Sequence, residues 1–377
     1  MIYFDNAATT YPKPDSVLQA ARAAPVEYGG NPGRSGHSMS LKTAEAVYAV
    51  REKAAKMFDA DPENVVFTLN CTHALNLAIK GVAVRGGHYI ISSLEHNSVA
   101  RPVHALAQRG ISYSIARVYE DDERTMKEII SLINPYTKGI ICTMGSNVTG
   151  QILPFGKIGE LCRARGLIFI ADGAQVCGVL PISLKNDCIN ILCMPGHKGL
   201  YGISGTGMLI TDGKYPIHHI MEGGTGSTSL ELNQPDFLPD SLESGTVNTV
   251  GIISLGAGMD YLAAKGIDNV RSAEDTLCSR FINGVRSVDG VKIYRLPNAR
   301  YLPIVLFNIE GKNSEETATE LSDAGFALRG GYHCSGLAHR SLGTLDVGGV
   351  RFSPSAFNTA GEVDKLISAV KRIAAGM

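Results

Sequence analysis

Two apolar runs in the middle of the chain restrict the fold more than any other feature of the sequence. Residues 166–171 (GLIFIA) run directly into Asp172, and residues 188–193 (CINILC) are followed five residues later by Lys198. Parallel strands that are buried on both faces read as continuous apolar runs, and ligands bind beyond the carboxyl ends of such strands. We therefore expect Asp172 and Lys198 to follow the carboxyl ends of two strands in a largely parallel sheet.

An Asp and a Lys placed in this way predict a site for pyridoxal 5′-phosphate (PLP). In such a site the Lys forms a Schiff base with the cofactor, and the Asp keeps the pyridine nitrogen protonated. Lys198 lies between glycines in residues 194–202 (MPGHKGLYG) and joins no charged helical face, so a solvated surface lysine does not explain it. The segments 172–175 (DGAQ) and 196–198 (GHK) together favour the cofactor site.

Apolar strand-like runs alternate with helix-like segments through the first two thirds of the chain, which is typical of a doubly wound α/β sheet. The expected strands are 65–68, 88–92, 112–116, 139–144, 167–171, 189–194 and 207–210. The expected helices are 16–24, 40–58, 74–82, 99–109, 125–133 and 155–165, with a glycine-rich loop over 28–36.

The pattern changes after residue 250 to one that is typical of an α+β unit. The expected helices there are 251–264, 269–288, 314–324 and 362–375, and the expected strands are 291–294, 304–309 and 326–329. With 377 residues the chain is long enough for two domains. We predict a large PLP-binding α/β domain over residues 16–258 and a small α+β domain formed by residues 1–15 and 259–377. The placement of residues 1–15 rests on the resemblance given below.

The composition excludes several classes of function. Lys and Arg number 35 against 36 Asp and Glu, and no basic block stands out, which argues against a nucleic-acid partner. The chain starts without a basic and apolar leader, and no apolar run is long enough to span a membrane. Eight cysteines without a CxxC pair indicate reduced thiols, with neither a disulfide framework nor a metal site, and predict a cytoplasmic protein.

Six short motifs occur in the order of a known family, at residues 6–10 (NAATT), 95–97 (EHN), 146–150 (SNVTG), 172–175 (DGAQ), 196–198 (GHK) and 243–248 (ESGTVN). With them the chain resembles, over nearly its whole length, the PLP enzymes of the class V aminotransferase fold. This resemblance implies the type I PLP-dependent transferase fold. It is closest to cysteine desulfurases, in the branch with an Arg-x-Gly-x-His-Cys segment, here residues 329–334 (RGGYHC).

The resemblance implies roles for residues around the cofactor ring. His96 matches a histidine that stacks on the ring and relays protons, and an imidazole suits both tasks because it is planar and titrates near neutral pH. Asn147 matches a residue that hydrogen-bonds the O3′ atom of the cofactor and also contacts the substrate. Gln175 matches a second contact to the same edge of the ring.

Cys71 and Thr72 lie at the start of a helix, where free N–H groups and the helix dipole favour an anion such as the cofactor phosphate. An ordinary Thr cap fits the same position equally well, and it is the resemblance that favours the phosphate. The resemblance implies His197 as a further donor. Many relatives carry a Ser two residues before this His, whereas this chain has Pro195, so one phosphate hydroxyl is lost. Thr246 matches a residue that reaches the phosphate of the neighbouring subunit, which implies a homodimer with shared active sites.

The resemblance also implies the substrate and the reaction. Arg351 matches the arginine that binds the substrate carboxylate, for which a guanidinium fork is better suited than an ammonium group. Cys334 matches the thiolate that attacks the sulfur of L-cysteine and carries it as a persulfide, with L-alanine as the second product. Cys334 lies in a glycine-rich loop in which Arg329 and His333 are expected to stabilise the thiolate.

The hypothesis from the sequence is a PLP-dependent cysteine desulfurase that passes sulfur to an acceptor protein, with Lys198, Cys334 and His96 as its catalytic residues. A selenocysteine lyase, a class V aminotransferase or another PLP lyase of a small amino acid would use Lys198, Asp172 and Arg351 in the same way. Only Cys334 separates these alternatives from a desulfurase. A protein that merely binds a partner is disfavoured because Lys198, Asp172, His96 and Arg351 are all present.

Overall fold

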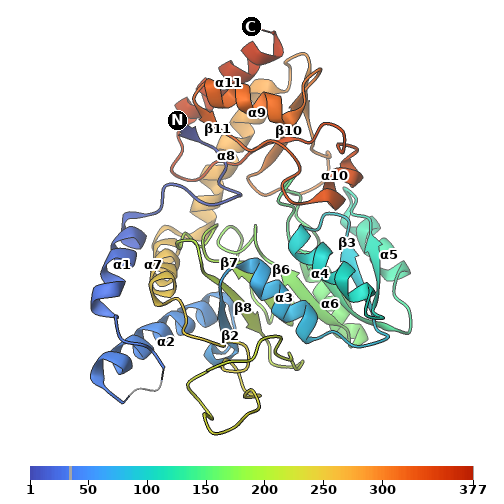
Figure 1. The fold of residues 1–377 in the computed structure, drawn as a ribbon. Helices are drawn as coiled ribbons and strands as arrows, with labels where there is room; N and C mark the ends of the chain where they lie inside the picture. The colour runs from blue at the N-terminus through green and yellow to red at the C-terminus, as the bar shows by residue number, and fades with distance from the viewer. Residues whose placement is uncertain (34–35, 377) are drawn as a thin grey trace.

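A seven-stranded sheet forms the centre of the larger, lower lobe of the computed structural model, which describes residues 1–33 and 36–376 (Figure 1). Its strand order is β2-β8-β7-β6-β5-β3-β4, and only β8 runs antiparallel to its neighbours. The strands are β2 (Val65–Thr68), β3 (His88–Ser92), β4 (Ser112–Ala116), β5 (Thr137–Thr143), β6 (Ile168–Asp172), β7 (Ile191–Pro195) and β8 (Gly207–Thr211). This sheet confirms the predicted doubly wound, mainly parallel α/β fold. Arg34 and Ser35, in the loop predicted over residues 28–36, lie outside the described residues.

Helices cover both faces of this sheet, which explains why its strands are apolar. They are α1 (Asp15–Glu27), α2 (Ser38–Phe58), α3 (Cys71–Gly81), α4 (Asn97–Ala107), α5 (Asp122–Ser131), α6 (Phe155–Arg165) and α7 (Thr249–Lys265). On β6, Ile168 and Ile170 join the apolar cluster of α3 and α4, while Phe169 and Ala171 join the cluster of α2, α6 and α7. Because side chains alternate along a strand, two covered faces leave no polar position before Asp172.

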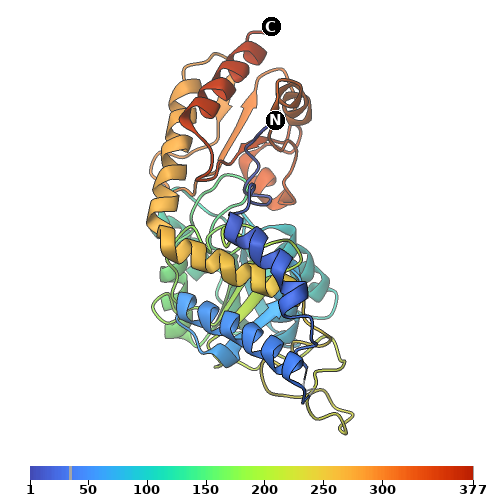
Figure 2. The same cartoon turned by 90° about the vertical axis from the view of Figure 1, so that its left-hand side faces the viewer.

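The upper lobe combines a small antiparallel sheet with helices around a separate apolar core. Its sheet has the order β12-β10-β9. The elements are α8 (Ile267–Val285), β9 (Val291–Ile293), β10 (Val305–Ile309), α9 (Ser314–Asp323), α10 (Gly336–Leu342), β12 (Val350–Phe352) and α11 (Ala360–Ala374). The rings of Phe281, Phe307 and Phe352 pack in this core, with centroids 4.5 Å apart for Phe281 and Phe352. Figure 2 shows α8 rising from the lower lobe along one side of the upper lobe.

The start of the chain lies against the upper lobe, where both termini are found (Figure 2). β1 (Ile2–Tyr3) pairs in parallel with β11 (Phe326–Ala327). Helix α7 packs against α1 and α2 of the lower lobe, whereas α8 packs mainly against α11. The division into residues 16–258 and residues 1–15 with 259–377 stays a prediction, because these contacts describe packing and not independent folding units.

The sequence pattern does not predict β1, β12 or α10. Each of these elements is too short for its apolar residues to show a repeat of two or 3.6 residues. Their conformation is therefore set by contacts with distant parts of the chain. Helix α1 continues to Glu27, beyond the predicted end at residue 24, and carries Pro25 in its last turn. Within residues 1–33 and 36–376, no helix combines the length and the apolar character that crossing a membrane requires.

The loop that carries Lys198 is pressed between β7 and α7. Its backbone is closed by hydrogen bonds from the Tyr201 N–H to the Lys198 carbonyl (2.9 Å) and from the Gly202 N–H to the Gly196 carbonyl (2.8 Å). Gly258 of α7 lies directly against this loop, since a Cβ built there would lie 2.1 Å from the carbonyl oxygen of Leu200. The lysine loop therefore depends on a helix surface that has no side chain at this point.

We expect Gly258→Ala to destabilise the protein by about 2 kcal/mol, because the added methyl group overlaps the Leu200 carbonyl and forces helix and loop apart. Urea unfolding followed by circular dichroism measures the change. Gly361→Ala in α11 is the control, since a Cβ there meets no atom within 4 Å, and it should change stability by less than about 1 kcal/mol. Equal unfolding midpoints for wild type and Gly258→Ala would contradict the close approach.

Candidate active site

A cavity opens at the carboxyl ends of β5, β6 and β7 in the lower lobe. It measures about 500 Å³, including its open mouth. Eight of the eleven predicted site residues line it, namely Cys71, Thr72, His96, Asn147, Asp172, Gln175, His197 and Lys198. Cys334, Thr246 and Arg351 do not line it. The fold thus gathers the cofactor residues that the sequence predicts, although their individual roles stay predictions.

Asp172 closes β6 as a buried carboxylate, 2% exposed. Its Oδ1 atom accepts a hydrogen bond from the Ala174 N–H (2.9 Å) and lies 3.5 Å from the Cys71 sulfur. None of the described residues donates to Oδ2. Burial raises the pKa of Asp172, and the Ala174 N–H and the charge of Lys198, which lower it, do not offset the burial. No described residue forms an ion pair with this carboxylate. A protonated pyridine nitrogen in the cavity would supply such a partner.

Helix α3 directs unpaired N–H groups into the cavity. The Asn70 side chain caps the helix by accepting the N–H of His73 (2.9 Å). Among the described residues, no acceptor contacts the N–H groups of Cys71 and Thr72 or the Thr72 hydroxyl. A helix start with free donors binds anions well. This arrangement fits the phosphate group of PLP.

His197 lies on the same wall of the cavity, between the lysine and Pro195. Its Nδ1 atom is 3.1 Å from the Thr9 hydroxyl, and none of the residues that the structure describes hydrogen-bonds the other ring nitrogen. Burial, with help from Lys198 and Lys13, lowers the pKa of His197 to about 4. The imidazole is therefore neutral at physiological pH and offers a single N–H donor.

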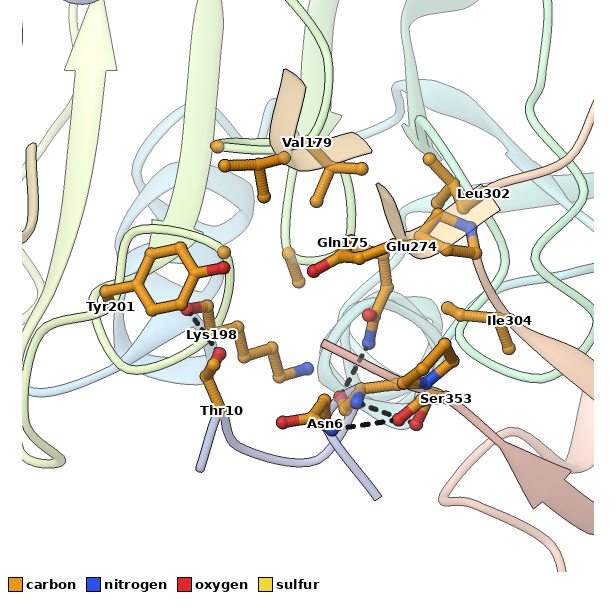
Figure 3. A pocket seen from close by; sticks show the side chains of 17 residues that line it. Asn6, Thr10, Gln175, Val179, Lys198, Tyr201, Glu274, Leu302, Ile304 and Ser353 are labelled. Atoms are coloured by element: carbon orange, nitrogen blue, oxygen red, sulfur yellow. Dashed lines mark hydrogen bonds between the residues drawn. The ribbon is translucent and has the colours of Figure 1, made fainter. Parts of the chain in front are cut away.

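Lys198 is held by the start of the chain. The Thr10 hydroxyl donates to its carbonyl oxygen (2.7 Å), and Figure 3 shows the two side chains together. Burial lowers the pKa of Lys198, and the positive charges of Arg351 and Arg329 add to this effect against Cys71 and Asp172. A lowered pKa favours the neutral amine, which is the form that attacks carbonyl carbons and accepts protons.

His96 precedes α4 and acts as its N-cap, with Nδ1 accepting the N–H of Ser98 (3.0 Å). Burial lowers the pKa of His96 to about 4, and Lys198, Arg329 and Arg351 contribute to the shift. The expectation that this ring titrates near neutral pH is therefore wrong for the environment in the structure. A neutral planar ring still suits stacking on a cofactor.

Asn147 connects the cavity to the loop that carries Cys334. Its Nδ2 donates to the carbonyl of His333 (2.8 Å), and its Oδ1 accepts the hydroxyl of Ser335 (2.7 Å). Gln175 donates from Nε2 to the carbonyl of Ala7 (3.0 Å). Both side chains therefore have structural partners in this state, and their predicted contacts with the cofactor stay predictions.

The Cys334 loop is seated on the rim of the cavity. The Asn97 N–H donates to the Cys334 carbonyl (2.8 Å), next to His96. His333 and Cys334 both have positive φ angles, 52° and 56°, a strained turn that presents the Cys334 side chain to solvent. The sulfur lies 3.6 Å from Nη2 of Arg329, so the guanidinium can stabilise a thiolate.

His333 does not add positive charge beside Cys334 as the sequence predicts. Its Nε2 contacts the carbonyl of Arg329 (3.0 Å), and its Nδ1 faces His339 (3.4 Å). Burial lowers the pKa of His333 to about 2, so the ring is neutral. The cation beside the Cys334 sulfur is therefore Arg329.

Arg351 lies in β12 between the two lobes and is 1% exposed. Its Nη2 forms an ion pair with Oδ1 of Asp5 (2.6 Å), and its Nη1 donates to the carbonyl of Asn147 (2.9 Å). Nε has no hydrogen-bond partner among residues 1–33 and 36–376. Arg351 thus already holds one carboxylate, and a substrate carboxylate would have to share the guanidinium with Asp5 or displace it.

Thr246 lies apart from the cavity within a single chain. It is exposed and lines a separate groove with Asn31, Tyr48 and Arg51, while its hydroxyl is 3.4 Å from Nδ2 of Asn31. The chain therefore does not bring Thr246 to its own phosphate site, and the predicted contact with a neighbouring subunit stays a prediction.

Glu95 connects two strand ends next to the cavity, and the sequence analysis assigns it no role. Its carboxylate is fully buried and accepts the N–H groups of Ser92 (3.2 Å) and Thr143 (3.0 Å), which tie the ends of β3 and β5 together. Burial raises the pKa of Glu95 to about 8. The sequence could have indicated this role, because Glu95 is an acidic residue shortly after an apolar strand and lies inside the motif 95–97.

The whole chain is similar to known proteins. The family model described as Aminotransferase class-V matches residues 2–366. A probable cysteine desulfurase from Methanothermobacter thermautotrophicus is 30% identical over 382 residues, which cover 99% of this chain and 94% of that protein. A cysteine desulfurase from Pectobacterium atrosepticum is 28% identical over 387 residues, which cover 99% of this chain and 93% of that protein.

Solved structures give the same result. The apo structure of a cysteine desulfurase from Thermococcus onnurineus aligns with a TM-score of 0.90 at 27% identity, covering 100% of this chain and 95% of that one. The cysteine desulfurase CsdA from Escherichia coli, in an S-sulfonic acid form, aligns with a TM-score of 0.88 at 26% identity, with the same coverage. The similarity therefore extends over both lobes and not only over the cavity.

We expect Glu95→Gln to remove part of the pH dependence of stability. The pKa of Glu95 is about 8 in the folded protein against an ordinary 4.5, so the folded state keeps a proton that the unfolded state loses first. The stability linked to this group is complete below about pH 4.5 and is lost as the pH rises through 8, at up to about 1.4 kcal/mol per pH unit. Urea unfolding at several pH values within this window should show a steeper loss for wild type than for Glu95→Gln, and parallel curves would contradict the assignment.

Proposed function

The chain belongs to the aminotransferase class-V family, and from this premise we propose that it is a PLP-dependent cysteine desulfurase with Cys334 as the sulfur acceptor. Its substrate is L-cysteine, and its products are L-alanine and a persulfide on Cys334. The named relatives and the solved neighbours over the full chain support the activity. The observation that carries the role of Cys334 is its exposed thiol on the cavity rim, beside Arg329, whereas the other cysteines are buried or half-buried.

The cavity residues fit PLP. Thr72 and His197 would hold its phosphate, Asp172 its pyridine nitrogen, His96 its ring and Lys198 its reactive carbon, and the bound cofactor would supply an electron sink for the α-carbon of the amino acid. The buried carboxylate without a positive partner and the unpaired N–H groups of α3 support this assignment.

Lys198 and Arg351 act on the α-carbon and the carboxylate of the substrate, which all amino acids share. The neutral amine of Lys198 takes the proton from the substrate α-carbon and later returns a proton to the β-carbon. Arg351 binds the substrate carboxylate through the guanidinium that Asp5 positions. The neutral ring of His96 covers the site and excludes water from the side of α4.

Cys334 performs the step that defines the reaction. Its thiolate, next to the guanidinium of Arg329, attacks the sulfur of the substrate. A sulfur–sulfur bond forms and the bond between Cβ and Sγ breaks. The electron pair of the broken bond remains on the substrate, and a proton added at Cβ completes L-alanine.

A selenocysteine lyase or an aminotransferase would share Lys198, Asp172 and Arg351. The relatives named as cysteine desulfurases do not favour these alternatives. The backbone of Cys334 has a positive φ angle, and its loop is held by hydrogen bonds from Asn97 to the Cys334 carbonyl and from Asn147 to the His333 carbonyl. Neither alternative reaction needs a cysteine held in this strained turn.

We expect Cys334→Ala to bind L-cysteine but to release alanine at least about a hundredfold more slowly, because removing a covalent nucleophile abolishes a step and not merely a contact. Alanine formed from cysteine in the presence of a reductant measures the rate. Cys188→Ala is the matched control, since Cys188 is half-buried in a different loop, and it should keep the wild-type rate. Undiminished alanine from Cys334→Ala would leave a lyase or an aminotransferase as the better answer.

The proposal also includes a homodimer and a cytoplasmic location. A homodimer would bring Thr246 of one subunit to the phosphate site of the other, which accounts for an exposed Thr246 far from its own cavity. The exposed thiol of Cys334 has to stay reduced between turnovers, which suits the cytoplasm, and an acceptor protein would take the persulfide sulfur.

Mixed dimers test the shared site. We expect Thr246→Glu to lower PLP content, because its carboxylate would repel the phosphate of the other subunit, and Lys198→Ala to abolish activity. Co-expression of the two variants with different tags should restore one intact site per mixed dimer and about half of the wild-type specific activity, if each variant supplies the residue that the other lacks. No recovery in the purified mixed dimer, or a fully active monomer by light scattering, would contradict a shared site.

A further inference from the structure

A second hollow borders Lys198 in addition to the cofactor cavity. It measures about 490 Å³ with its mouth and is bordered by Thr10, Gln175, Lys198, Tyr201 and Glu274. Lys198 and Gln175 also line the cofactor cavity, so the lysine amine has access to both spaces. Figure 3 shows the side chains of Lys198, Tyr201 and Glu274 arranged around this hollow.

Glu274 is a buried acid at the wall of the hollow, 7% exposed, and comes from α8 of the upper lobe. One carboxylate oxygen accepts the N–H of Ala356 (3.2 Å), and no described residue donates to the other oxygen. Burial raises the pKa of Glu274 to about 8, with a smaller contribution from Asp275. The raised pKa favours the protonated acid near neutral pH, and the Ala356 N–H is the one hydrogen-bond partner of this carboxyl group among the described residues.

The charged and titratable surroundings of Glu274 are few. On α8 itself, Asp275 is paired with Arg271 (3.2 Å), and Cys278 lies one turn further on. Helix α7 contributes Tyr261, whose pKa Glu274 helps to raise. The segment that covers Glu274, residues 353–357, carries no charge. Across the hollow stand only Tyr201 and Lys198 among the titratable residues that border it.

Tyr201 reaches the hollow from the lysine loop. Its backbone has a positive φ of 60°, and its ring packs edge-on against Tyr261 (centroids 5.1 Å apart) and Phe357 (6.1 Å). These rings fix its direction. No described residue forms a hydrogen bond with the hydroxyl, although Glu274 is close enough to raise its pKa. The hollow is lined by apolar side chains together with the polar groups of Thr10, Gln175 and Glu274, so a water molecule held by these groups is the available partner for the buried hydroxyl of Tyr201.

We propose that Glu274 exchanges protons with Lys198 through water in this hollow and the hydroxyl of Tyr201. The inference rests on the proposed function, in which Lys198 takes a proton from Cα and returns one to Cβ. When the carboxylic acid gives a proton to the chain of water, the lysine amine gains one and the carboxylate remains. The reverse transfer restores both groups, so no co-reactant is needed. Glu274 touches no substrate and acts only through Lys198.

The exchange determines where the hydrogen in the product comes from. If Lys198 trades its proton with Glu274 and water, the hydrogen removed from Cα is diluted before a proton reaches Cβ. If Lys198 is isolated, the same hydrogen is carried across to Cβ. A residue that only supports the fold would change the rate of turnover but not this ratio.

Single turnover of the PLP-loaded enzyme with cysteine deuterated at Cα, in ordinary water, tests the proposal by mass spectrometry of alanine. We expect Glu274→Gln to raise the fraction of deuterium at Cβ by about threefold or more, and Tyr201→Phe to raise it in the same direction. Glu274→Gln keeps the oxygen that accepts the Ala356 N–H, and Tyr201→Phe keeps the ring packing. Asp268→Asn, an exposed acid in the first turn of α8, is the control and should leave the ratio unchanged.

An unchanged deuterium ratio in both variants would overturn the relay while leaving the desulfurase proposal intact. If the wild type forms no alanine at all, the proposed function fails instead. The difference between the infrared spectra of cofactor-free wild type and Glu274→Gln tests the protonation of Glu274 independently of activity. A protonated carboxyl band near neutral pH that disappears above about pH 8 supports the relay, and its absence at neutral pH would overturn it.

Discussion

The parallel alignment of β3, β5, β6 and β7 is the constraint on which the active site depends. In this register Thr143 lies opposite Asp172, and Asp172 opposite Cys193, so the strand ends meet at one edge. The buried carboxylate of Glu95 holds that edge by accepting N–H groups from two strands. A slip of one residue would turn Asp172 to the opposite face and remove it from the cavity.

The two arginines near His96 and Lys198 give this edge its electrostatic character. Arg351 is buried and Arg329 is partly exposed, and the charges of both lower the pKa of His96 and of Lys198 further than burial alone does. Burial raises the free energy of the charged forms, so the pKa of His96 and of Lys198 falls and their neutral forms are favoured. The same field favours anions in the cavity. One arrangement of charges therefore accounts both for the neutral side chains and for a cavity that suits anionic ligands.

The first residues of the chain join the two lobes at this point. Thr10 holds the backbone of Lys198, Asp5 holds the guanidinium of Arg351, and Asn6 donates from Nδ2 to the carbonyl of Ser353 (3.0 Å). A short segment thereby sets the position of the lysine in the lower lobe relative to the arginine between the lobes. The hollow behind Lys198 lies in the same junction, where α8 brings Glu274 from the upper lobe.

The sequence by itself determined the α/β fold, most strands to within a few residues, and the eight residues that line the cofactor cavity. The strands and the positions of Asp172 and Lys198 follow from local signals, since apolar runs mark buried strands and polar residues mark their ends. The other cavity residues, such as His96, Asn147 and His197, came from the resemblance of short motifs to a known family. Tertiary structure alone decided that Asp5 pairs with Arg351, that Asn147 fastens the Cys334 loop, that His96 and His333 are neutral, and that Thr246 lies outside its own site. Each depends on burial or on a contact between distant segments. Such contacts leave no period in the sequence, because their partners meet only after the chain has folded.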